Sequence, residues 1–217
     1  MPSRTATRRR GVRRRSPSGL RRVHGRARRI VTIGDPDAGK LRARARDVST
    51  VNASIRKLIA DMRATMLRNR GIGLAAPQIG VPLRVLVAGP RRPALALVNP
   101  RFRERRGRQV GPEGCLSIPG IYADVRRARH VVVDGWNAQG RRVTVRGSGL
   151  FARVLQHEID HLNGVLFIDR VAPRRLVRRP RPLRAARRRS TAGAASDGRR
   201  MIEVKTALRH RQVARLS

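Results

Sequence analysis

The chain has 217 residues, of which 40% are hydrophobic and 2% aromatic, so it is long enough for one domain with an aliphatic core. No stretch approaches the roughly 18 to 20 apolar residues of a membrane span, and no apolar run follows the basic start, which argues against a membrane protein and a secreted one. The formal net charge of +39 points to polyanionic partners.

The positive charge is concentrated at the two ends. Residues 1–29 hold 12 basic and no acidic residues, and residues 173–217 hold 15 basic and two acidic ones. Such segments repel themselves and bury little, so we expect both tails to be disordered in isolation, the second with some helix. RNA or the ribosome is the expected partner, and idle tails from an arginine-biased sequence are the alternative. A transit peptide is less favoured because the arginine clusters lack amphipathicity.

Residues 30–172 form the predicted domain between the tails. Its first element is a short strand at residues 30–33, followed by a turn. Apolar residues at helical spacing then predict a helix over residues 51–69, capped by Ser49 or Thr50.

Short strands dominate the middle of the chain. The patterns predict strands at 83–88 and 94–98 and a hairpin of 130–134 with 141–146. A helix over 149–162, ended by Asn163-Gly164, and a last strand at 166–168 follow. Strands before a late helix, without regular alternation, favour an α+β fold.

The late helix carries His157-Glu158-Ile159-Asp160-His161, an H-E-x-x-H pattern. Positions four apart lie on one helix face, so the two histidines can hold a metal while Glu158 reaches a water bound to it. Two surface histidines on a solvated helix are the alternative. The pattern predicts a metalloenzyme.

Two histidines leave such a site incomplete, because catalytic metal sites typically use three protein ligands. Cys115, in the stretch Glu113-Gly114-Cys115-Leu116-Ser117, is the only cysteine, so it forms no internal disulfide. A thiolate is a strong ligand for soft or borderline metals, although a lone cysteine is more often a small buried hydrophobe. Cys115 is therefore the candidate third ligand.

A third segment, residues 71–80, reads Gly-Ile-Gly-Leu-Ala-Ala-Pro-Gln-Ile-Gly. Small residues here allow the backbone to approach another group closely, and Gln78 supplies an amide that can donate to a carbonyl oxygen. Taken alone, such a segment is more often a glycine-rich turn between a helix and a strand. It is no phosphate loop, because no Gly-Lys-Ser/Thr follows.

Together, G-x-G-x-A-A-x-Q, E-G-C-x-S and H-E-x-x-H occur in this order without a substitution, and the chain closely resembles the peptide deformylase family. The resemblance covers about residues 30–172 and neither tail. It implies an α+β fold with antiparallel or mixed sheets packed around a central H-E-x-x-H helix. It also implies a cytoplasmic bacterial enzyme that hydrolyses the formyl group from the N-terminal formylmethionine of nascent polypeptides.

The resemblance further implies the metal and the catalytic groups. One divalent metal is held by Cys115, His157 and His161; it is ferrous iron by family analogy, although zinc, nickel or cobalt would suit the same ligands. Glu158 carries the proton, and the Gln78 side chain and Leu116 N–H donate to the oxyanion.

The implied substrate-binding residues fall into two groups. The peptide backbone binds near Ile72, Gly73 and Gly114, and the methionine pocket is lined by Ile72, His157, Leu150 and Val154. Glu113 has a structural role, in which it pairs with Arg127. The alternatives are a ribosome- or RNA-associated basic protein with a vestigial deformylase-like centre and a general metallopeptidase.

Overall fold

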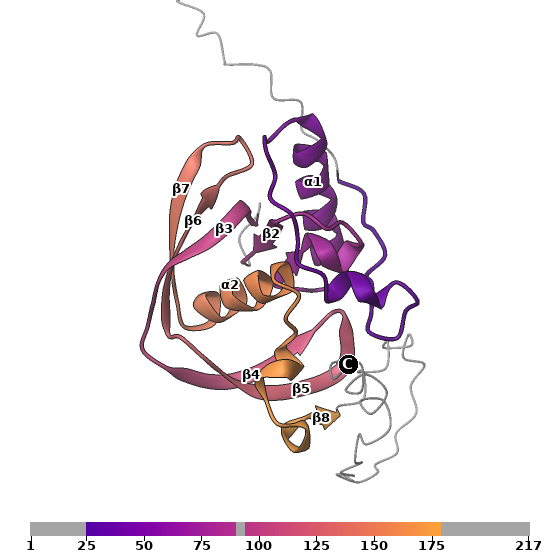
Figure 1. Ribbon diagram of the computed structural model, residues 1–217, viewed down its shortest axis with the longest axis vertical. Helices are drawn as coiled ribbons and strands as arrows, with labels where there is room; N and C mark the ends of the chain where they lie inside the picture. The colour runs from indigo at the N-terminus through magenta and orange to yellow at the C-terminus, as the bar shows by residue number, and fades with distance from the viewer. Residues whose placement is uncertain (1–24, 90–93, 179–217) are drawn as a thin grey trace, which may run out of the picture.

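Two antiparallel sheets and two α-helices make up the computed structural model, which describes residues 25–89 and 94–178 (Figure 1). The predicted α+β class is confirmed. The larger sheet has the order β1-β2-β3-β6-β7, with strands Gly73–Ala75, Val85–Ala88, Leu95–Arg106, His130–Trp136 and Arg142–Ser148. The smaller sheet has the order β4-β5-β8, with strands Gln109–Cys115, Ile118–Arg127 and Val177–Arg178.

Helix α1 (Ala53–Arg68) packs its apolar face on the larger sheet, as its spacing predicts. Its buried side chains include Ile59, Met62 and Met66, which lie in one core cluster with residues of β2 and β3. The predicted cap is wrong: Asn52 caps the helix, and its side chain accepts a hydrogen bond of 3.1 Å from the backbone N–H of Ile55.

Helix α2 has the predicted bounds, Gly149–Leu162. It contacts β1, β2 and β7 and lies between the two sheets in Figure 1. Leu155 and Leu162 are fully buried in a second core cluster, which fixes the helix against the larger sheet. Gly164 follows with a left-handed φ of 74°, which suits glycine and ends the helix.

Two predicted strands are wrong. Residues 30–33 belong to no strand, and Ile33 already lies in a turn. Val31 N–H donates to the Gln78 carbonyl at 2.8 Å and Ile33 N–H to the Ser117 carbonyl at 3.0 Å. Residues 166–168 enter a 3-10 helix, Phe167–Arg170, because the Asp169 carboxylate accepts a hydrogen bond from Leu166 N–H and favours a turn. A short apolar run does not distinguish these conformations.

The strands predicted at 83–88 and 94–98 and the hairpin are present, but β3 is much longer than expected. The β4–β5 hairpin was not predicted. Its glycines and prolines, such as Gly111, Pro112 and Pro119, are typical of turns, although the register from Gln109↔Arg127 to Gly114↔Tyr122 is regular.

Packed structure extends beyond residues 30–172 at both ends. Arg26 N–H donates to the Asp61 carboxylate at 2.8 Å and Arg28 N–H to the Thr65 hydroxyl at 2.9 Å, so this part of the predicted N-terminal tail lies on α1. At the C-terminal end, strand β8, which belongs to the predicted C-terminal tail, pairs with β5. The remainder of the tails, including the predicted C-terminal helix, lies outside the described residues. Neither α-helix of the described chain is both long and apolar enough to span a membrane.

Candidate active site

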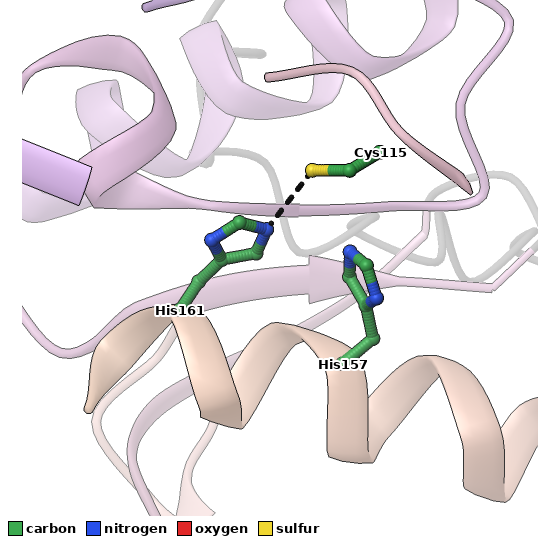
Figure 2. Close-up of side chains that lie close together, drawn as sticks. All are labelled: Cys115, His157 and His161. Carbon is green, nitrogen blue, oxygen red and sulfur yellow. Dashed lines mark hydrogen bonds between the residues drawn. The ribbon is translucent and has the colours of Figure 1, made fainter. Parts of the chain in front are cut away.

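Cys115, His157 and His161 lie together, as Figure 2 shows. Cys115 ends β4, and the two histidines project toward it from successive turns of α2. One ligand atom from each residue lies within 4.8 Å of the others, and the Cys115 Sγ to His161 Nε2 distance is 3.2 Å. The structure therefore brings the three predicted ligands to one point.

The ring of His157 is oriented by Glu113. Its Nδ1 lies 2.9 Å from a Glu113 carboxylate oxygen. A histidine that ligates a metal commonly donates its other ring N–H to a carboxylate. This contact leaves Nε2 of His157 available to a metal.

Glu113 is itself held by two arginines. Its carboxylate accepts two hydrogen bonds of 2.8 Å from Arg127, which confirms the predicted pair, and one of 2.8 Å from Arg153. Burial raises the pKa of Glu113, but the bonds from Arg127 and His157 outweigh it and hold this pKa well below the usual range. Sequence reasoning missed Arg153, although it precedes His157 by four positions and so shares its helix face.

Asp160 ties α2 to the smaller sheet. Its carboxylate binds Arg127, at the end of β5, and Arg170, in the 3-10 helix after α2. Asp160 is buried, so it needs such partners. Asp160, which directly precedes His161 in the H-E-x-x-H pattern, thus helps to hold α2 in place.

The two histidines of the cluster have pKa values that are shifted in opposite directions. Burial and the neighbouring His157 hold the pKa of His161 well below its usual value, which favours the neutral ligating form. Burial also lowers the pKa of His157, but the hydrogen bonds to Cys115 and Glu113 outweigh it and raise this pKa. A thiol and two imidazoles are also a donor set that suits zinc or other borderline metals.

Glu158 lies between the cluster and the larger sheet. It is 4% exposed, and its Oε2 accepts no hydrogen bond from any described residue. Burial raises its pKa to about 7, so the group can both accept and release a proton near neutral pH.

Gln78 directs its amide N–H groups at the cluster. Its Oε1 accepts a hydrogen bond of 2.8 Å from Ala75 N–H, while its Nε2 lies 3.4 Å from Cys115 Sγ and 3.3 Å from the Ser117 hydroxyl. Ser117 is fully buried and was not singled out in the sequence. Leu116 lies in the turn between β4 and β5, next to Cys115.

The predicted substrate-binding residues differ in exposure. Val154 is buried, and a Cβ added at Gly73 would lie 2.9 Å from it. Ile72 and Leu150 are large hydrophobic residues that are 46% and 64% exposed. Gly114 precedes Cys115 on β4, and a Cβ there would meet the Tyr122 ring at 2.5 Å.

Metal-dependent hydrolases combine a set of metal ligands such as Cys115, His157 and His161 with a buried carboxyl group of raised pKa such as Glu158. The chain is a metal-dependent hydrolase. Comparison with known proteins shows to which family of hydrolases the chain belongs. The sequence profile described as polypeptide deformylase matches residues 27–176. A peptide deformylase of Thermomicrobium roseum is 48% identical over 160 residues, which are 70% of this chain and 89% of that protein.

Solved structures agree with this result. Peptide deformylase from Thermotoga maritima has a TM-score of 0.63 and 40% identity, and the match covers 68% of this chain and 99% of that one. A class I type b peptide deformylase from Acinetobacter baumannii, bound to Met-Ala-Ser, has a TM-score of 0.63 and 34% identity over 67% of this chain and 98% of that one. The chain belongs to the polypeptide deformylase family, and its function is removal of the N-formyl group from formylmethionine at the start of new polypeptides.

Proposed function

We propose that Cys115, His157 and His161 hold one divalent metal ion, ferrous iron in the cell, at the centre of a deformylase site built on α2. The convergence of three donors within 4.8 Å supports this assignment. A divalent metal in such a site lowers the pKa of a coordinated water toward neutrality and polarises a carbonyl oxygen. Zinc, nickel and cobalt suit the same ligands, so the choice of iron rests on the family.

Glu158 is the proton carrier of this reaction. As a carboxylate it accepts a proton from the attacking water, and as an acid it delivers that proton to the departing amine. The observation that carries the proposal is its buried, unpartnered Oε2 together with a pKa of about 7. The products are formate and a free N-terminus.

Gln78 and Leu116 stabilise the negative charge that develops on the formyl oxygen. The Gln78 Nε2 already faces Cys115, and its Oε1 is fixed by Ala75 N–H, so the amide donates without reorganising. The Leu116 N–H follows directly after the cysteine ligand, which favours it as the second donor.

The peptide substrate binds as an added strand. Strands β1 and β4 are edge strands of their sheets. Strand β1 contacts α2, and β4 carries Glu113 and Cys115, whose side chains meet the two histidines of α2. Main-chain groups near Ile72, Gly73 and Gly114 can therefore pair with an extended peptide. Leu150 and Val154 on α2 supply apolar surface for the methionine side chain. The related Acinetobacter baumannii enzyme was solved with Met-Ala-Ser, the peptide that deformylation of formyl-Met-Ala-Ser would release.

Formate release from formyl-Met-Ala-Ser, assayed anaerobically with ferrous iron or nickel, tests the proposal. We expect turnover by the native chain, and Glu158→Ala should retain metal but lose nearly all activity because the proton carrier is absent. Activity near the native level in this variant would refute the role of Glu158. Cys115→Ser should lower the metal content measured by elemental analysis, and unchanged content would refute ligation.

The arginine-rich ends suit a second role for the same enzyme. Residues 1–24 and 179–217 carry most of their charge as arginine, which binds phosphates without a fixed geometry. We assign them to ribosomal RNA, near the emerging substrate, and assign the enzyme to the bacterial cytoplasm, where formylmethionyl chains are made.

A further inference from the structure

A cleft of about 280 Å³ lies between the β3–β4 turn and the β5–β6 turn, apart from the residues to which the reaction is assigned. Phe102, Gly107 and Ala128 form part of its lining. The remaining lining residues are polar or charged, and five of them are arginines: Arg105, Arg108, Arg126, Arg127 and Arg170.

The five arginines fall into two groups. Arg127 and Arg170 are bound to Asp160, and Arg127 also to Glu113, so they are neutralised within the protein. Arg105, Arg108 and Arg126 are exposed and form no ion pair with any residue in the described ranges. The guanidinium of Arg105 lies 5.1 Å from the centre of the Phe102 ring, which holds it at the cleft wall.

A concave surface lined by unneutralised charge of one sign focuses the electrostatic field and concentrates ions of the opposite sign. Guanidinium groups match phosphate oxygens with paired donors. We propose that Arg105, Arg108 and Arg126 form an RNA-binding site in which they contact the phosphate backbone. This site belongs to the folded domain and is separate from the two tails.

The exposure of the three groups favours RNA over other anions. A small enclosed anion is usually held by buried donors. The three unpaired arginines instead stand at the surface, with Arg105 near the end of β3, Arg108 in the β3–β4 turn and Arg126 near the end of β5. A membrane surface would require apolar side chains to insert, and Phe102, half-buried, is the one large apolar side chain that lines the cleft. A phosphodiester chain needs only the spaced cations.

The test compares two triple variants of the full chain. Arg105→Gln, Arg108→Gln and Arg126→Gln are combined in the first, and the matched control combines Arg44→Gln, Arg68→Gln and Arg141→Gln, three exposed arginines elsewhere on the domain. Fluorescence anisotropy with a short labelled single-stranded RNA measures affinity between low and moderate salt. The plot of the logarithm of the association constant against the logarithm of the salt concentration has a negative slope. Loss of three phosphate contacts should make this slope shallower by about 2 and weaken binding roughly tenfold at low salt, relative to the control.

Equal affinity and equal slope in the two variants would overturn the proposal, since the cleft would then contribute no more than any three surface arginines. A calorimetric signal for inorganic phosphate that the first variant abolishes, while RNA binding is unchanged, would also overturn it in favour of a small-anion site. Formate release by both variants should equal that of the native chain, so this result is independent of the assigned catalytic roles.

Discussion

Gly73 on β1 lies directly against Glu158 on α2: a Cβ at Gly73 would come within 2.2 Å of Glu158 Oε1. Real Cβ atoms do not approach an oxygen so closely, so any side chain at this position must displace the carboxylate or the strand. The glycine-rich segment and the H-E-x-x-H helix therefore meet at Glu158, the proposed proton carrier.

We expect Gly73→Ala to lower kcat/KM for a formylated peptide about 100-fold, because a shift of about 1 Å in a catalytic group has that effect. Metal content should stay native, since the ligands come from other positions. Gly39→Ala is the control: a Cβ at Gly39 meets nothing within 4 Å, so activity should be unchanged. Native activity of Gly73→Ala would show that Glu158 is not held as described.

The buried ion pairs around Glu113 should matter more than the surface ones. Arg153→Met keeps the apolar stem but removes the bonds of Arg153 to Glu113 and to the Val125 carbonyl. We expect a loss of about 3 kcal/mol in the free energy of unfolding, because a buried carboxylate loses a charged partner. Arg103→Met breaks the exposed pair with Asp134 and should cost less than about 1 kcal/mol. Denaturant unfolding of both variants measures the difference, and equal losses would contradict it.

The sequence predicted those parts of the site that depend on local spacing. His157, Glu158 and His161 share a helix whose bounds were correct, and Cys115 was identified by its chemistry as the only thiol. The family resemblance supplied Arg127 as the partner of Glu113, but the partners of Asp160 depend on how β5 and the turn after α2 pack together, and local spacing in a single sequence does not give that packing. Arg153 was the exception, because its spacing from His157 could have revealed it.

The missed elements have a similar cause. The β4–β5 hairpin contains Gly and Pro that local rules assign to turns, while its stability comes from cross-strand pairing and from packing against the segment that follows α2, where Leu166 and Phe167 lie. Residues 166–168 read as a strand because they are apolar, yet the Asp169 side chain closes a turn there. In both cases long-range packing or one side-chain contact outweighs the local pattern.

Asp61 should make stability depend on pH. Burial raises its pKa, but Lys57, the Arg26 N–H and Arg28 outweigh it, so the folded pKa lies below the usual value. The carboxylate thus contributes stability above the unfolded pKa of about 3.9, and this contribution is lost as pH falls through the folded pKa. Asp61→Asn should lower the free energy of unfolding by about 2 kcal/mol at neutral pH, and by progressively less as the pH falls below about 3.9 and through the folded pKa. A difference that does not shrink in acid would contradict this account.

Removal of the arginine-rich ends should separate catalysis from attachment to the ribosome. The cuts must respect the contacts of Arg26 and Arg28 with α1 and the pairing of β8, so residues 1–24 and 179–217 are deleted. Turnover of a small formyl peptide should remain native, because the catalytic groups and their supports lie within residues 25–178. Co-sedimentation with ribosomes at low salt should fall strongly and lose most of its salt dependence, since many phosphate contacts are removed. Unchanged co-sedimentation would show that the tails do not contribute to attachment, whereas lost turnover would show that they support the fold.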